Sequence, residues 1–251
     1  MLLKNCKKQA KNCLKKRRVR AVRISLCIRA AAILSGAAAY AVMQKADFGK
    51  YTDCLLLVLQ IALCILTCGL LGAMREGRTA WLYCSACGKE PSGVQFLYWL
   101  RRGRGFRAAW LFLNLRVRKA AWTAMLSLPG AVMLTAGILL VDRLSRDVRM
   151  FTFAGGAVCL TLGVVFAWII RQKYALAPIL LVRSPQKGVR SAIRNSCFLM
   201  EEDCANLCRL QLSFLPWAAA CITMIPLVYV VPYYQQAKTC MLRSILRAHT
   251  V

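Results

Sequence analysis

Long apolar runs constrain this chain more than any other feature of its sequence. A helix needs about 20 apolar residues to cross the hydrocarbon core of a bilayer. Five windows reach that length with almost no charge, and we predict spans at residues 24–43, 54–74, 120–141, 150–170 and 210–231. Hydrophobic residues make up 59% of the chain, against roughly 45–50% in soluble proteins. The sequence therefore predicts an all-α polytopic transmembrane bundle.

The first span has a competing interpretation as a signal peptide. Arg29 lies near its start and can snorkel toward the basic end of the helix. Ala39 and Ala41 fit a small-x-small cleavage site. However, the 23 residues before the apolar run are long for the charged region of a signal peptide, which favours a retained span.

The distribution of positive charge predicts the orientation. The chain has 36 Lys and Arg residues and 9 Asp and Glu residues. The cations concentrate in residues 1–23, 75–119 and 171–209, and these segments alternate with segments poor in charge. By the positive-inside rule the three rich segments are cytoplasmic. We expect a multi-pass protein of the bacterial plasma membrane with a cytoplasmic N-terminus.

The C-terminal segment leaves two topologies open. Five spans make residues 232–251 an external tail, yet this tail carries Lys238, Arg243 and Arg247 and no acid. A sixth span over residues 227–246 would return it to the cytoplasm. That stretch also contains Gln235 and Gln236, which are costly to expose to lipid. Five spans are the main prediction and six are the alternative.

The basic segments favour anionic lipid headgroups as partners. Each Lys or Arg next to the membrane is worth about 1 kcal/mol against an anionic surface. Binding to nucleic acid would also call for stacking aromatic residues, and residues 1–39 contain none. We therefore predict anionic lipid as the partner of the basic N-terminal segment 1–23, with a membrane protein as a further candidate partner, and no nucleic acid.

Amphipathic stretches in the cytoplasmic segments predict helices that lie in the interface, within residues 79–119 and 187–200. In the second stretch, Val189, Ala192 and Ile193 share a face opposite Arg190 and Arg194. In the first, aromatic and basic residues are candidates for contact with lipid or a partner protein. They are Trp99, Arg101, Arg102, Arg104, Arg107 and Trp110.

The acidic run 201–203 precedes the last predicted span. We expect it to act at a helix N-terminus and to pair with Arg190 or Arg194. A cation or partner site is the alternative, but no second carboxylate cluster supports it.

The chain contains 14 cysteines, which resemble a metal or disulfide framework. Several of them fall inside predicted spans, where a thiol serves as a small apolar residue. The pairs Cys84/Cys87 and Cys204/Cys208 could together form a four-thiolate zinc site. This would require two distant pairs to meet at an unusual spacing, so we predict no metal and no cofactor.

Catalytic motifs are absent from the sequence. His249 is the only histidine, no predicted span has a carboxylate at mid-depth, and no phosphate-binding loop, HExxH or GxSxG motif occurs. We therefore predict a protein that is not an enzyme. Four residues interrupt predicted spans and could expose the backbone to a transported solute. They are Pro129, Gly130, Pro216 and Pro226.

The C-terminal third resembles a known family. Residues 173–178 (KYALAP) follow a predicted span, Leu212-Ser213-Phe214 and Trp217 come later, and Pro232-Tyr233 closes the last span. This order, with Gly72 at the end of the second span, is similar to the uncharacterised bacterial integral-membrane family called domain of unknown function 975. The resemblance covers about residues 24–246. The chain departs from the family pattern at Cys240-Met241 and at the acidic run 201–203.

This resemblance implies a multi-pass helical fold and no established activity. The sequence therefore favours a non-enzymatic membrane protein that organises lipid or partner proteins through its basic interfacial helices. A small permease or transporter subunit for an uncharged or anionic solute is the alternative.

Overall fold

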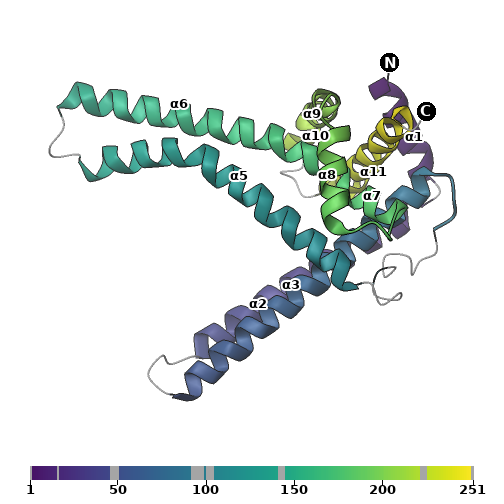
Figure 1. Ribbon diagram of the computed structural model, residues 1–251, viewed down its shortest axis with the longest axis horizontal. Coiled ribbons are helices and arrows are strands. Elements are labelled where there is room, and N and C mark those ends of the chain that lie inside the picture. Colours follow the sequence, from purple (N-terminus) through teal and green to yellow (C-terminus); the bar gives the residue numbers. More distant parts are fainter. Residues whose placement is uncertain are drawn as a thin grey trace.

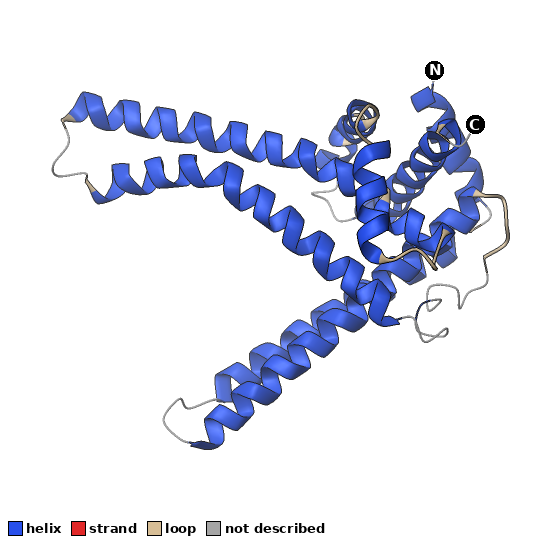
Figure 2. Cartoon of the chain, in the orientation of Figure 1, coloured by secondary structure: helices blue, strands red, loops and turns tan. Residues whose placement is uncertain are grey.

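The described part of the chain is helical. The computed structural model describes residues 2–15, 17–45, 51–91, 99, 105–140, 145–220 and 225–249. Within these ranges the regular elements are all helices and none is a strand (Figure 2). The predicted all-α class is therefore confirmed.

Two long helical hairpins project from a compact group of shorter helices (Figure 1). The first hairpin consists of α2 (Arg18–Lys45) and α3 (Tyr51–Ala86), and the second of α5 (Gly105–Leu139) and α6 (Arg146–Ile170). We call the remaining elements the helical body. They are α1 (Leu2–Lys15), the 3-10 helix η2 (Arg171–Tyr174), α7 (Ala177–Arg183), α8 (Val189–Leu199), α9 (Cys204–Leu212), α10 (Leu215–Ala220) and α11 (Ile225–Ala248).

Two helices in the described residues are long and apolar enough to cross a membrane. They are Gly105–Leu139, which is α5, and Asp147–Arg183, which is α6 continued through η2 into α7. Only 11% and 17% of their most apolar windows are buried inside the protein. A core helix of a soluble protein would be mostly buried. Among the residues searched only these two helices qualify, so the predicted five or six spans are not confirmed.

Glycines let α5 and α6 approach closely. A Cβ atom added at Gly130 would collide with the backbone of Leu160, and one added at Gly163 would collide with the carbonyl of Leu126. Small residues at helix contacts are typical of association in lipid, where close backbone packing replaces the hydrophobic effect. The second hairpin is therefore held together by backbone contact along its length.

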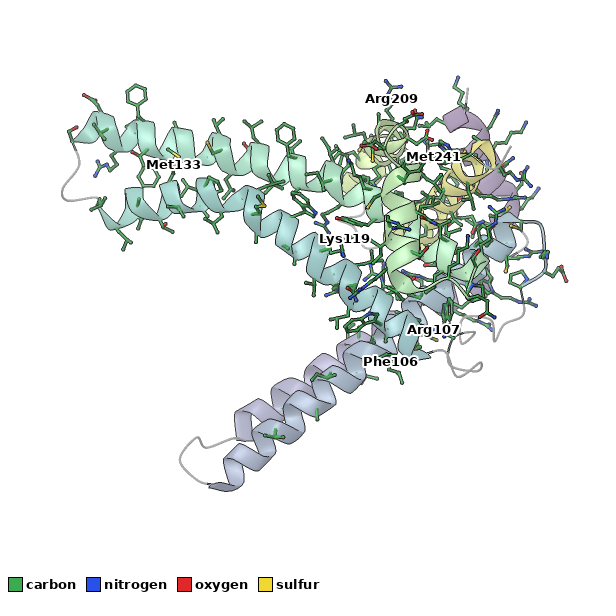
Figure 3. All side chains as sticks on the ribbon, viewed as in Figure 1. Phe106, Arg107, Lys119, Met133, Arg209 and Met241 are labelled. Carbon is green, nitrogen blue, oxygen red and sulfur yellow. The ribbon has the colours of Figure 1, made fainter. Side chains whose placement is uncertain are left out.

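A bend in α5 separates the hairpin from the helical body. The ribbon changes direction between the labelled residues Lys119 and Met133 (Figure 3). Pro129 lies inside this helix, and proline removes a backbone hydrogen bond and clashes with the preceding turn. The bend follows from this proline, and it turns the apolar end of α5 alongside α6.

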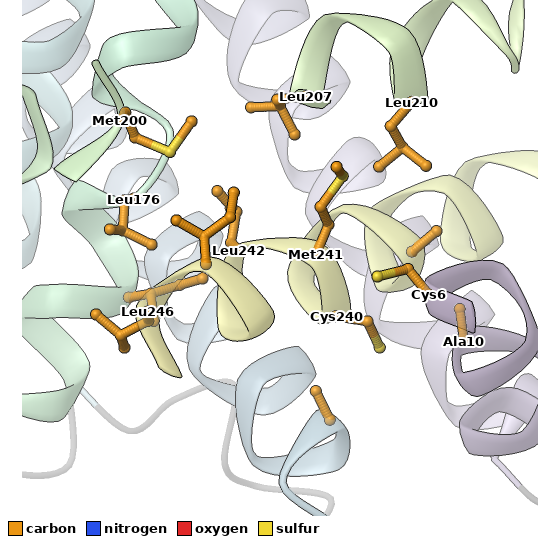
Figure 4. Close-up of a cluster of buried hydrophobic side chains, with 14 of the residues drawn as sticks. Cys6, Ala10, Leu176, Met200, Leu207, Leu210, Cys240, Met241, Leu242 and Leu246 are labelled. Atoms are coloured by element: carbon orange, nitrogen blue, oxygen red, sulfur yellow. The ribbon is translucent and has the colours of Figure 1, made fainter. Parts of the chain in front are cut away.

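The core of the helical body is built around α11 (Figure 4). The N-terminal helix α1 presents Cys6, Ala10 and Leu14 on one face, and these are buried, while all its lysines except Lys7 are exposed. Lys7 Nζ lies 4.8 Å from the centre of the Phe214 ring. Cys6 and Ala10 join the same apolar cluster as Met241 of α11 and Leu207 of α9. The basic N-terminal segment is thus part of the folded core through one face of its helix.

The predicted helix at residues 187–200 corresponds to α8. Val189, Ala192 and Ile193 are buried, whereas Arg190 and Arg194 are exposed, as the spacing predicts. The buried face belongs to an apolar cluster with residues of α5 and α7. The apolar side of α8 is therefore covered by protein and does not lie open to a bilayer.

The predicted interfacial stretch 79–119 is described only in part, because residues 92–98 and 100–104 lie outside the described residues. Helix α3 continues through the charged residues 75–78 to Ala86, and α5 begins at Gly105 and includes the amphipathic stretch. Charge does not interrupt backbone hydrogen bonding, so both helices extend beyond their apolar runs. Helix α3 ends where Gly88 adopts a φ of 79° and Lys89 N–H donates to the Cys84 carbonyl over 3.2 Å. This is a glycine-terminated helix end.

The predicted span 210–231 is not one helix, and the predicted tail 232–251 is not a tail. Helix α9 ends at Leu212, and Pro216 lies at the start of α10, where proline is tolerated. Residues 225–248 form the helix α11. Its polar side chains are compatible with this position because they pack against protein. Gln236, for example, is fully buried. Helix α11 coincides closely with the sixth span of the alternative topology, but it forms the centre of the helical body.

Candidate functional site

A basic cavity of about 800 Å³ lies where α3, α5, η2–α7 and α11 meet. Six cationic side chains and one carboxylate line it. The cations are Arg75 and Arg78 of α3, Arg116 and Lys119 of α5, Arg171 of η2 and Lys238 of α11, and the carboxylate is Glu76 of α3. In Figure 3 the labelled Lys119 lies where α5 reaches the helical body.

Helical spacing brings the cations of each element to one wall. On α5, Phe112, Arg116, Lys119, Thr123 and Ser127 line the cavity, and steps of three and four residues place side chains on one helix face. On α3 the same rule brings Arg75, Arg78 and Thr79 to the opposite wall. The cavity is therefore formed by polar faces of helices whose other ends are apolar.

Phe112 forms an apolar floor between two guanidinium groups. The Cζ atom of Arg116 lies 5.1 Å from the centre of its ring, and that of Arg75 lies 5.8 Å away. Both distances fit cation–π contacts. A Cβ atom added at Gly72 would come within 2.8 Å of Phe112 Cδ1. Glycine at this position of α3 therefore allows the ring to seat against the helix.

Glu76 is a buried carboxyl group in the cavity wall. It is 6% exposed, and its Oε2 atom has no hydrogen-bond partner among the described residues. Burial raises the pKa of Glu76 from 4.5 to about 7, although the charges of Arg75, Lys119 and Arg78 oppose this rise. Near neutral pH this carboxyl group, the one acid in the described part of the lining, is therefore partly protonated and offsets less than one of the positive charges.

Lys238 closes the cavity from α11. Burial, together with the charges of Lys119, Arg75 and Arg171, lowers its pKa from 10.5 to about 8. A lowered lysine pKa next to other cations means that the positive charges repel one another in the absence of an anion. The arrangement can hold a negatively charged group, which would relieve this repulsion.

Hydrogen bonds fix the η2 wall. The side chains of Gln172 and Gln211 exchange two hydrogen bonds, of 2.8 and 3.2 Å between nitrogen and oxygen. Trp122 Nε1–H donates to the Tyr174 hydroxyl over 3.0 Å, and the Ser196 hydroxyl donates to the Lys173 carbonyl over 2.7 Å. These contacts anchor the short segment that carries Arg171 to α5, α8 and α9.

The predicted lipid- or partner-facing residues lie elsewhere. Trp99 is only 1% exposed, so this indole is buried and does not face lipid. Trp110 is exposed and stacks on Phe106 with ring centres 6.4 Å apart. Arg107 donates to the Pro185 carbonyl on the surface. Arg101, Arg102 and Arg104 lie outside the described residues, and none of the predicted set that is described lines the cavity.

The four predicted thiol ligands do not meet. Cys84 and Cys87 lie at the end of α3, and Cys204 and Cys208 lie on α9. Among the described residues, no group of three or more His, Cys, Asp or Glu side chains is placed to hold a metal ion. The second Cys pair instead contributes Cys204 to the apolar cluster around α11.

The predicted helix breaks do not form a site with the cavity either. Gly130 is buried against α6, where its missing side chain serves packing. Pro129 and Pro216 are absent from the described lining of the cavity, and the side chain of Pro226 lies outside what the structure describes.

The acidic run 201–203 forms ion pairs other than those predicted. Glu201 Oε1 lies 3.8 Å from Lys173 Nζ, and Asp203 Oδ2 lies 3.4 Å from His249 Nε2. The predicted partners Arg190 and Arg194 are on the exposed face of α8. The acidic run therefore fastens η2 and the end of α11 to the turn before α9.

Sequence reasoning missed the cavity, although one signal was present. Arg75 directly follows the predicted span 54–74, Lys119 directly precedes the span 120–141, and Arg171 directly follows the span 150–170. The positive-inside rule treats each of these residues only as a charge that sets the orientation of the chain in the membrane. All three share a position one residue outside an apolar run.

Comparison with known proteins adds no further assignment: no family model, no curated protein and no solved structure matches this chain.

Proposed function

We propose that this protein is a non-enzymatic integral membrane protein that binds the phosphate groups of anionic lipids in its basic cavity. In this function it organises lipid, and through lipid its partner proteins, at the cytoplasmic face of a bacterial plasma membrane. The observation that carries the proposal is the convergence of six cations on a cavity whose walls begin where apolar runs end. Basic pockets between membrane helices on the cytoplasmic side are suited to lipid headgroups.

The proposed topology has four spans, arranged as two hairpins inserted from one side. Helices α5 and α6 form the second hairpin. The first hairpin, α2 and α3, exposes Ile33 (70%), Leu34 (70%) and Ile65 (68%), which is favourable only in an apolar solvent. Both hairpins begin and end at the helical body, so the body and both termini belong on one side. The excess of Lys and Arg in the body favours the cytoplasm.

The cavity then lies at the depth of the headgroups. Arg75, Lys119 and Arg171 mark the cytoplasmic ends of three spans, and the phosphate layer of a bilayer begins where its hydrocarbon core ends. Guanidinium groups are suited to this ligand, because their forked donors match the oxygens of phosphate. Arg78 and Lys238 extend the positive lining away from the membrane on α3 and α11.

The test measures lipid binding by the purified full-length chain. After removal of endogenous lipid in detergent, phosphatidylglycerol is added and its binding is followed by native mass spectrometry. The double variant Arg75→Gln/Lys119→Gln should bind about thirtyfold more weakly, from about 1 kcal/mol for each cation. The control Arg118→Gln/Lys187→Gln removes the same charge at exposed positions outside the cavity.

Equal losses in the cavity variant and the control variant would refute the proposal, because binding would then follow total charge rather than the site. A loss confined to the cavity variant supports it.

A permease for an anionic solute would use the same cations but would also conduct. The helix breaks that could open a path are not part of the cavity lining, and the glycine contacts close the space between α5 and α6. We therefore expect proteoliposomes to show no protein-dependent flux of phosphate or sulfate. A flux that Lys119→Gln abolishes would favour the permease instead.

A further inference from the structure

We infer that the preferred ligand of the basic cavity is a lipid that carries two phosphate groups, rather than a lipid with one. This inference rests on the proposed function and names the substrate class of that same site.

The charge of the lining exceeds what one phosphodiester can offset. Even with Glu76 ionised, cations outnumber acids by five among the lining residues. A lipid such as phosphatidylglycerol contributes a single negative charge. Several cations would remain close together without a counter-charge, and partly buried cations are costly when left uncompensated. A second phosphate group reduces this excess within the same cavity.

The size and shape of the cavity also exceed one phosphate group. About 800 Å³ lies within the range of sites for ligands of roughly drug size. The cations come from four separate elements, α3, α5, η2 and α11. A phosphodiester has two free oxygens and contacts cations at about 2.7–2.9 Å. One such group cannot reach all four walls, whereas two linked groups can divide the walls between them.

The part of α5 beyond Lys119 favours a lipid over a soluble polyanion as the ligand. Ala120 and Ala124 of α5 are exposed, are one helical turn apart and line the cavity beyond Lys119. Next to them, Met125 and Leu128 are 68% and 57% exposed on the same helix. Beyond Lys119 the α5 part of the lining thus consists of small side chains, two of them the hydroxyl residues Thr123 and Ser127, and the large exposed apolar side chains stand beside it on the same helix. An acyl chain attached to the headgroup would continue along this apolar surface.

The test compares four probes on the full-length protein in detergent. They are cardiolipin, phosphatidylglycerol, inorganic pyrophosphate and inorganic phosphate. We expect cardiolipin to bind about tenfold more tightly than phosphatidylglycerol, the change that about 1.4 kcal/mol produces. Native mass spectrometry gives the affinities, and thermal unfolding of each variant confirms that it is folded.

The variant Lys238→Gln separates the two phosphate positions from general charge. It removes the cation that α11 contributes to the described lining, on a different element from Arg75 and Lys119. We expect the preference for cardiolipin to fall severalfold while binding of phosphatidylglycerol changes little. Lys187→Gln, an exposed lysine outside the cavity, should leave the preference unchanged.

The outcomes distinguish this inference from the proposed function. Equal affinity for the two lipids, with both dependent on Arg75 and Lys119, overturns the inference and leaves the proposed function in place. Binding of pyrophosphate as tight as that of cardiolipin overturns the assignment to a lipid. Lipid binding that does not depend on Arg75 and Lys119 overturns both.

Discussion

At the scale of single residues, Glu76 makes the cavity sensitive to pH. Its wall neighbours are Arg75 and Arg78 on α3 and Lys119 on α5, with Arg171 of η2 and Lys238 of α11 in the same cavity. Burial raises the pKa of its carboxyl group to about 7. Below that pH the group is neutral, and above it a negative charge competes with an anionic ligand for the same cations.

We therefore predict that binding of anionic lipid weakens as pH rises through about 7. The Lys238 ammonium, whose pKa burial lowers to about 8, loses its charge next and weakens binding again. Glu76→Gln should remove the first step and keep the second. The measurement is lipid affinity between about pH 6 and pH 9. An identical pH profile for Glu76→Gln and the unaltered protein would contradict this role.

The same carboxyl group predicts a dependence of stability on pH. Because its pKa in the folded protein lies above its ordinary value of 4.5, ionisation favours the unfolded state. Its contribution to stability is thus highest below about pH 4.5 and falls until about pH 7. Glu76→Gln should raise the melting temperature relative to the unaltered protein at pH 8. A lower melting temperature at pH 8 would show that the ionised group is stabilised by its cations.

At the scale of elements, we expect substitutions at two glycines of α6 to have opposite effects on thermal stability. A Cβ at Gly163 collides with the Leu126 carbonyl, whereas one at Gly155 meets only the mobile end of Met133, at 3.4 Å from Cε. Gly163→Ala should separate α5 from α6 and lower the unfolding temperature. Gly155→Ala should leave it unchanged or raise it, because alanine favours a helix by about 0.5–1 kcal/mol. Equal effects of the two substitutions on thermal unfolding in detergent would refute the close packing.

Helix α1 provides a second test at this scale. Ala10 is fully buried between α1 and α11, and Lys11 beside it is exposed. Ala10→Leu should overpack this contact at a cost of about 1–3 kcal/mol. Lys11→Leu adds a similar side chain to the outer face and should change little. Limited proteolysis at the N-terminus reports the difference, and equal protection of both variants would contradict the packing of α1.

The sequence predicts helices well where their buried apolar residues recur at helical spacing. The face of α8 that contains Val189 and Ile193 is buried as its spacing indicates, and α6 ends at Ile170, where the apolar run ends. The extension of α3 beyond Arg75 was missed, because a hydropathy window detects an apolar run and not the continuation of a helix through charged residues. The division of residues 210–231 occurs at the turn of Ser213 and Phe214, whose N–H groups donate to the carbonyls of Arg209 and Gln211. The Phe214 side chain is buried in the cluster around α11, and an apolar run in the sequence does not reveal this packing.

The cavity could not be predicted in the same way. Its cations lie on elements that are up to 163 residues apart, from Arg75 to Lys238. Each of them looks like an ordinary flanking charge in the sequence. Only the docking of α11 between the bases of the hairpins brings Lys238 to Lys119 and Arg171. Likewise Gly72 has no evident role until Phe112 packs against it.

At the scale of the whole molecule, two hairpins that leave one helical body explain the distribution of charge. The apolar surfaces are concentrated on the hairpins, and the cations gather on the body and at the hairpin bases (Figure 3). The proposed insertion from one side would leave the body in contact with headgroups. This proposal differs from the predicted five spans in one respect, because it would return the C-terminus to the cytoplasm.

The location of the C-terminus therefore tests the account most directly. A fluorescent reporter that folds only in the cytoplasm and a phosphatase reporter that is active only outside it would each be fused after residue 251 of the full-length chain. Two inserted hairpins predict fluorescence and no phosphatase activity, with the same result at the N-terminus. Phosphatase activity at the C-terminus, with fluorescence at the N-terminus, would require an odd number of spans and would contradict the account.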